Sequence, residues 1–285
     1  MRTIAALVVA ITTAGLFAHA QSPLPGTGAE FEAATIKRNS SADNNSRLGF
    51  QPGGRFTMTN NPIRSLIAAA YGTPQPLPSF LVIGGPDWLD KDRYDVIAKA
   101  AGDPEPGPGG PPPIMFEMMR TLLAQRFKLV VHRETREQPA YALVTARADG
   151  ALPRGMTIST FDCSTLLAAE RAGAPRPAPN AAFCGLRTSP GRVQGGTVSM
   201  SIFATNLSRG VGRPVFDRTG LTASYDFVLE FSPDQMPPGS AAAGPPSDGA
   251  SLFTALQEQL GLKLESIRAP VDVLVIDSIE RPAEN

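Results

Sequence analysis

The sequence predicts an α+β protein built from two diverged copies of one small module, each with the element order β-α-β-β-α-β-β. Segments of similar pattern recur in the same order along the chain, which indicates an internal duplication. Within each copy the expected helices carry one apolar face, and the expected strands alternate apolar and polar residues. Two helices covering one face of a sheet would make each copy a two-layer unit.

The first helix of each copy follows a Gly-Arg turn, at Gly54-Arg55 and at Gly191-Arg192. Apolar residues then recur at helical spacing, which places them on one buried face. These residues are Ile63, Leu66, Ile67, Ala70 and Tyr71 in the first copy, and Met200, Phe203, Ala204 and Leu207 in the second.

A Tyr-Asp pair opens the next shared strand, as Tyr94-Asp95 in the first copy and Tyr225-Asp226 in the second. Apolar residues follow at every second position, as expected for a strand with one buried face. Each copy then enters a Pro/Gly-rich stretch, residues 102–113 and 232–248, which we expect to form loops.

A second amphipathic helix follows each loop. Its apolar residues are Met115, Met118, Met119, Leu122 and Leu123 in the first copy, and Leu252, Phe253, Leu256 and Leu260 in the second. The methionines lie at helical spacing and predict core packing rather than a metal or cofactor site. A short strand is expected after each helix, and a separate final strand is expected to start at Pro139 and at Pro270, 131 positions later. One more strand, over residues 31–37, precedes the first copy.

The N-terminus is typical of a secretory signal peptide. Arg2 supplies a positive charge, residues 4–17 are largely apolar, and Ala18-His19-Ala20 offers small residues on both sides of a histidine. We therefore expect cleavage after residue 20 and export to the periplasm or beyond, with no further membrane span. The remaining chain would divide into a first module (21–150), a linker or insertion (151–185) and a second module (186–285).

Charge and cysteine content narrow the class of protein. Outside the signal segment 25 basic and 26 acidic residues remain, and this balance argues against nucleic acid as a partner. Cys163 and Cys184 are the two cysteines, and in an oxidising compartment such an isolated pair indicates a disulfide. Without a Cys-x-x-Cys motif or nearby histidines, a metal or redox pair is the weaker interpretation.

Carboxylates beside the sole tryptophan are the one hint of hydrolytic chemistry. Asp87, Asp90, Asp92 and Asp95 surround Trp88, and a carboxylate pair beside an aromatic ring suits glycan binding or glycoside hydrolysis. The competing interpretation makes Asp87 a turn residue and Trp88 a core residue.

Other catalytic or cofactor motifs are weak. His132, the one histidine after the signal segment, is interpreted as a solvated strand-end residue rather than a catalytic base. Its neighbours Arg133 and Arg136 alternate with acidic residues, which is typical of an exposed stretch, although a recognition role stays open. The glycine-rich residues 107–111 lack the Lys-Ser/Thr of a phosphate loop. The sequence therefore predicts no catalytic residues, no metal and no cofactor.

Several motifs resemble those of a large soil-associated bacterial family of exported proteins of unknown function. The matching segments are residues 31–37, 85–89, 125–129, 132–137, 212–214, 219–221, 225–227 and 251–262. Some members of that family carry this region on membrane peptidases that look like antibiotic-sensing receptors, and this resemblance implies sensing or binding. The module order also resembles the short N-terminal domains of secretins and TonB-dependent receptors, which bind periplasmic partner proteins.

We therefore expect a non-enzymatic periplasmic or secreted module that binds a partner protein or an envelope ligand, with Trp88, Asp87, Arg133 and Arg136 as candidate binding residues. Two alternatives stay open. One is an exported, carboxylate-dependent glycan hydrolase, and the other is an envelope protein whose copies assemble with one another.

Overall fold

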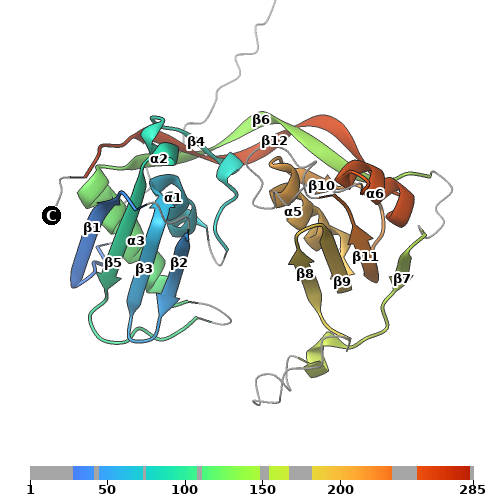
Figure 1. The fold of residues 1–285 in the computed structure, drawn as a ribbon, viewed down its shortest axis with the longest axis horizontal. Helices are drawn as coiled ribbons and strands as arrows, with labels where there is room; N and C mark the ends of the chain where they lie inside the picture. The colour runs from blue at the N-terminus through green and yellow to red at the C-terminus, as the bar shows by residue number, and fades with distance from the viewer. Residues whose placement is uncertain are drawn as a thin grey trace, which may run out of the picture.

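The computed structural model describes residues 28–41, 45–72, 75–107, 111–147, 154–166, 182–232 and 249–282. The expected signal peptide and most of the expected loop 232–248 lie outside these residues. The described part is a mixed α+β fold with twelve strands in three four-stranded sheets. Two lobes, each with one sheet, lie next to each other beneath a third sheet that runs across both (Figure 1). No helix among the described residues is long and apolar enough to span a membrane.

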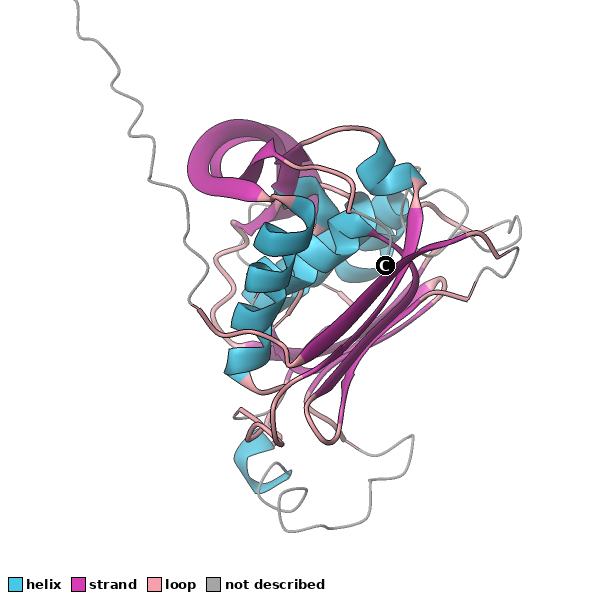
Figure 2. Ribbon diagram, turned by 90° about the vertical axis from the view of Figure 1, so that its left-hand side faces the viewer, coloured by secondary structure: helices cyan, strands magenta, loops and turns pink. Residues whose placement is uncertain are grey.

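The first lobe has an antiparallel sheet of order β1-β5-β3-β2 with helices on one face. Its strands are β1 (Ala33–Asn39), β2 (Arg47–Gln51), β3 (Arg55–Pro62) and β5 (Arg93–Lys99). Its helices are α1 (Ile63–Tyr71), the short α2 (Trp88–Lys91) and α3 (Pro113–Phe127). Figure 2 shows the helices as one layer and the strands as another, with the far face of the sheet left open.

The second lobe has the same arrangement, with strand order β7-β11-β9-β8. Its strands are β7 (Met156–Ile158), β8 (Gly185–Ser189), β9 (Arg192–Ser199) and β11 (Ser224–Glu230). Its helices are α5 (Met200–Val211) and α6 (Leu252–Leu260). The strand β7 lies within residues 151–185, which were expected to be a linker or insertion. It pairs antiparallel with β11 and forms an edge of the sheet, so this part of the segment belongs to the second lobe.

The expected helical faces and strand alternations are confirmed by burial, with one exception. All of the predicted face residues of α1, α3 and α5 are buried. In α6, Phe253 is partly exposed and stacks edge-on against Tyr141 instead of entering the core.

The third sheet is a long antiparallel ribbon with a short strand on each side. It consists of β6 (Val130–Thr145), β12 (Leu262–Ser278), β4 (Val82–Gly84) and β10 (Val215–Asp217). The strand β10 pairs parallel with β6 near its end, and β4 pairs parallel with β12 near its end. The ribbon thereby links the two lobes (Figure 1).

Both long strands run through a proline, so the prediction of separate strands starting at Pro139 and Pro270 was wrong. Tyr141 donates its backbone N–H away from the ribbon, to the carbonyl of Pro214. Alternation along the strand directs the backbone of Pro139 to the same outer side, and Pro270 faces outward in the same way. Among the described residues, no third strand pairs with the outer side of β6 or β12 at these positions. A proline at such an unpaired edge removes no ladder hydrogen bond.

The ribbon carries side chains from each half of the chain into the opposite lobe. Leu143 near the end of β6 belongs to the core of the second lobe. Leu274 and Ile276 near the end of β12 belong to the core of the first lobe. The lobes therefore differ from the expected modules 21–150 and 186–285, since neither lobe is one continuous segment.

The repeated Tyr-Asp pair has a structural explanation. Asp95 accepts a hydrogen bond from the backbone N–H of Asn60 (2.8 Å), and Asp226 accepts one from that of Thr197 (2.7 Å). Asn60 and Thr197 both have a left-handed backbone, with φ near 50°, beside irregularities in the strand pairing. Each aspartate thus holds the backbone where its sheet bulges.

Candidate functional site

The four acidic residues around Trp88 bind to different partners. Asp87 pairs with Lys91 (2.7 Å) and Asp90 with Arg64 (2.7 Å). Asp92 pairs with both Arg38 and Arg281, at 2.8 and 3.0 Å. The hydrogen bond from Lys91 lowers the pKa of Asp87, a residue whose side chain is 84% exposed. Asp95 is held by Asn39 as well as by the bulge described above. Each carboxylate therefore has its own partner in the fold.

Trp88 lies in the core of the first lobe rather than on the surface. It is 9% exposed, and its ring meets that of Tyr94 edge-on with 6.4 Å between centroids. The guanidinium of Arg281 covers the ring at 5.2 Å. Such a cation–π contact closes the surface over Trp88 and leaves the ring buried.

The two candidate arginines on β6 also contact the protein itself. Arg133 donates a hydrogen bond to the carbonyl oxygen of Tyr71 (2.8 Å), which links the ribbon to the end of α1. Arg136 forms an ion pair with Glu134 on its own strand. In the described part of the chain, no group of three or more His, Cys, Asp or Glu side chains is placed to hold a metal ion.

His132 has carboxylate partners on both sides of its ring. Its Nδ1 lies 2.8 Å from Asp277, and its Nε2 lies 3.8 Å from Glu134. The hydrogen bond to Asp277 is the largest contribution that raises the pKa of His132. Since the pKa is higher in the folded state, the contact stabilises the fold fully below about pH 6.5. That contribution is lost as the pH rises through the folded-state pKa.

Replacing Asp277 by asparagine is expected to lower the pKa of His132 towards about 6.5. His132 is the one histidine of residues 21–285, so in a protein made without residues 1–20 its ring protons can be followed by NMR without assignment. Glu280→Gln, at an exposed position near the same end of β12, is the control. A wild-type pKa at or below the ordinary histidine value would contradict the expectation.

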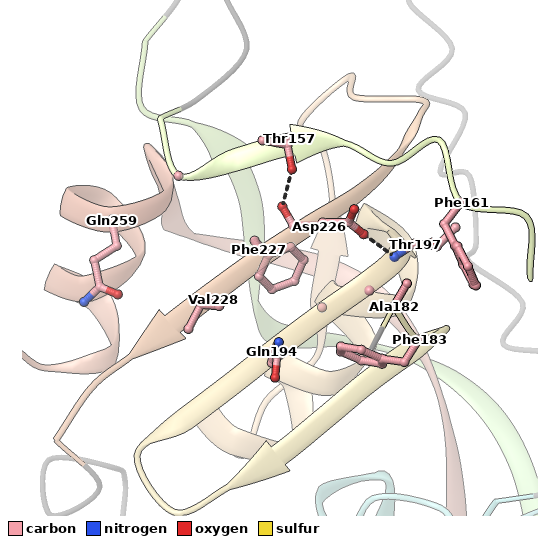
Figure 3. A pocket seen from close by; sticks show the side chains of 13 residues that line it. Thr157, Phe161, Ala182, Phe183, Gln194, Thr197, Asp226, Phe227, Val228 and Gln259 are labelled. Atoms are coloured by element: carbon pink, nitrogen blue, oxygen red, sulfur yellow. Dashed lines mark hydrogen bonds between the residues drawn. The ribbon is translucent and has the colours of Figure 1, made fainter. Parts of the chain in front are cut away.

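A groove lies in the second lobe, on the face of the sheet opposite the helices (Figure 3). It has a volume of about 630 Å³. Its lining residues come from β7, β9, β11, α6 and the chain next to both cysteines: Gly155, Thr157, Phe161, Ala182, Phe183, Gln194, Gly195, Gly196, Thr197, Asp226, Phe227, Val228 and Gln259. Volumes of this size are typical of ligand sites.

A disulfide joins the two walls of this groove. Cys163 and Cys184 are bonded, which confirms the predicted pairing. Phe161 lies two residues before the first cysteine and Phe183 lies directly before the second, so the bond ties together the chain segments that carry both rings. Since β7 and β8 are the opposite edges of the sheet, the linked segments span the sheet from edge to edge.

Glycine lets one wall lie close to the sheet. A Cβ atom on Gly196 would stand 2.3 Å from the carbonyl oxygen of Phe183, too close for any other residue. The ring of Phe183 is in turn covered by the guanidinium of Arg187, at 3.9 Å. On the other side, the hydroxyl of Ser159 lies 2.9 Å from that of Thr197. Both walls are thus anchored to the sheet by direct contacts.

The groove is almost free of charge. Asp226 is the single ionisable residue among those that line it, and its Oδ1 already accepts the hydrogen bond from Thr197. The amide of Gln259 is bonded to the backbone of Glu230, at 2.9 and 2.7 Å. The amide of Gln194 has no hydrogen-bond partner among the described residues and faces the groove (Figure 3). Three phenyl rings, from Phe161, Phe183 and Phe227, and the amide of Gln194 suit an uncharged ligand with apolar and polar groups.

This groove was not predicted from the sequence. None of the candidates Trp88, Asp87, Arg133 and Arg136 lines it. The phenylalanines beside the two cysteines and the Gly195-Gly196 pair were the signals available. Whether these residues line a groove depends on how the chain crosses the face of the sheet, which is a tertiary feature.

Comparison with known proteins identifies a family and no function. The family described as "Protein of unknown function (DUF3738)" matches residues 64–279. No curated protein and no solved structure matches the chain.

Proposed function

Since the chain belongs to the DUF3738 family of proteins of unknown function, we propose its role from the groove: a non-enzymatic, exported binding protein that senses or holds an uncharged envelope ligand or partner segment. The observation that carries the proposal is the disulfide-tied groove on the open sheet face of the second lobe. A groove with two anchored walls is preorganised, which reduces the entropic cost of binding.

Export is part of the proposal and has two supports. The N-terminal residues have the pattern of a signal peptide. The Cys163–Cys184 disulfide is compatible with an oxidising compartment, where such bonds persist. The resemblance to a soil-associated bacterial family, some members of which carry this region on sensor-like membrane peptidases, agrees with a binding role.

We also propose that the chain arose by internal duplication. Adding 131 positions maps Pro139 onto Pro270, Leu143 onto Leu274 and Asp95 onto Asp226. The same offset maps Gln138 onto Ala269, and these two residues lie directly opposite each other in the ribbon. An approximate two-fold axis through that pair would relate the lobes. The groove would then be a later specialisation of one copy, formed around the disulfide-bonded segment.

Substitution at equivalent positions of the two lobes tests the groove. Val228 lines the groove and is 39% exposed, and Ile97, 131 positions earlier, is 53% exposed on the first-lobe strand β5. Val228→Arg would place bulk and charge in the groove, whereas Ile97→Arg makes the same change outside it. A thermal-shift screen of peptidoglycan fragments, glycans and envelope peptides supplies the ligand.

We expect a ligand that stabilises the wild type and the Ile97→Arg variant but not Val228→Arg. At a concentration of 100 times Kd the stabilisation amounts to about 2.7 kcal/mol. A ligand that stabilises Val228→Arg as well as the wild type would place binding elsewhere. A screen without any such ligand would count against a binding role.

A further inference from the structure

A second pocket lies between the lobes, beneath the ribbon, with a volume of about 400 Å³. The short 3-10 helix Ser79–Leu81 contributes Phe80 and Leu81, β10 contributes Val215 and Phe216, and β12 contributes Val271. Its walls are therefore mainly apolar and belong to three separate parts of the fold. Ligand sites occur preferentially at such junctions between structural units.

Arg209 and Asp272 are the two charged residues among those that line this pocket, and the hydroxyl of Thr135 donates a hydrogen bond to Asp272 at 2.6 Å. The Nη2 of Arg209 donates a hydrogen bond to the carbonyl oxygen of Pro76 in the first lobe, at 3.2 Å. Among the described residues no carboxylate lies within ion-pair distance of Arg209. A guanidinium has five N–H donors in a planar fork, so most of them stay available beside the apolar walls.

The ribbon is the main connection between the lobes. Its centre, around Gln138 and Ala269, is two strands wide, because β4 and β10 pair only with its ends. A two-stranded ribbon twists more readily than a wider sheet. An occupant that touches Phe80, Val215 and Val271 together would restrict how the lobes turn about this centre.

We propose that the interlobe pocket binds a compact apolar molecule with one anionic group, placed on Arg209, and that binding fixes the relative orientation of the lobes. This site is separate from the groove of the second lobe and does not depend on the function proposed for it. Ligand binding would thereby narrow the range of lobe orientations beyond what the hydrogen bond from Arg209 to Pro76 achieves alone.

The anionic dye 8-anilinonaphthalene-1-sulfonate has the required chemistry and serves as the probe. Thr205 is exposed and lines the pocket, so Thr205→Trp would fill it. Ile202→Trp adds the same ring on the same helix, outside the pocket, and is the matched control. Arg209→Gln removes the charge, whereas Arg209→Lys retains it.

We expect fluorescence titration to show probe binding that is weakened about tenfold or more by Thr205→Trp and by Arg209→Gln. Ile202→Trp and Arg209→Lys should bind nearly as the wild type does. In small-angle scattering, saturating probe should narrow the distribution of interatomic distances in the wild type and leave Thr205→Trp unchanged.

The opposite results overturn the proposal. They are absence of probe binding, equal binding by Thr205→Trp and the wild type, or equal loss in Ile202→Trp. Loss of binding in Val228→Arg would assign the probe to the groove instead. Binding without a change in scattering would refute the coupling to lobe orientation.

Discussion

Replacing Leu274 by alanine is expected to destabilise the first lobe by about 2–5 kcal/mol, as is typical of a large-to-small change in a packed core. Leu274 is 1% exposed and lies in the core that residues of the first half of the chain form. Its neighbour across the ladder, Val82, is buried in the same core. The expected effect is large because rigid elements surround the site on both sides, so the cavity cannot close.

The sole tryptophan makes this effect measurable for one lobe. Trp88 is buried in the first lobe, so its fluorescence reports the unfolding of that lobe in urea. Leu274→Ala should lower the midpoint of the fluorescence transition, and Ser266→Ala, at an exposed position of the same strand, should change stability by less than about 0.5 kcal/mol. An unchanged fluorescence midpoint in Leu274→Ala would show that β12 contributes little to the stability of the first core.

Each long strand of the ribbon contributes side chains to the core of the opposite lobe, and this explains why the domain boundaries were hard to predict. Leu143, 131 positions before Leu274, fills the second core from β6. A cut near residue 150 would leave Leu143 without its core and the first core without Leu274. The sequence shows where strands lie, but the partner of a strand is decided by packing between segments far apart in the chain.

Local features were predictable where one segment determines them. The buried faces of α1 and α5 followed from helical periodicity alone, as the burial of Leu66 and Phe203 shows. The start of a new strand was predicted wrongly at Pro139 and Pro270, because a proline usually interrupts a strand. It does not do so where the backbone nitrogen faces an unpaired strand edge. The groove could not be predicted, since Phe161 and Phe183 line it together only in the folded chain.

Replacing both Cys163 and Cys184 by serine is expected to lower the free energy of unfolding by about 3 kcal/mol, the value for a closed loop of this length in the chain-entropy model. The bond spans 21 positions, and both cysteines lie in the second lobe. Far-UV circular dichroism in urea should detect the loss, while the Trp88 fluorescence transition should move less. Treating the wild type with a reductant is the control, because it should reproduce the loss without a substitution.

Ligand binding gives the disulfide a second, independent readout. Without the bond, the segments that carry Phe161 and Phe183 keep their separate contacts to the sheet, at Thr197 and Gly196, but lose the link between them. A groove ligand should then bind more weakly than the loss of global stability explains, because ordering the two walls must accompany binding. If the double variant unfolds like the wild type and binds the ligand equally well, the disulfide does not preorganise the groove. The walls would then be held by their contacts to the sheet alone.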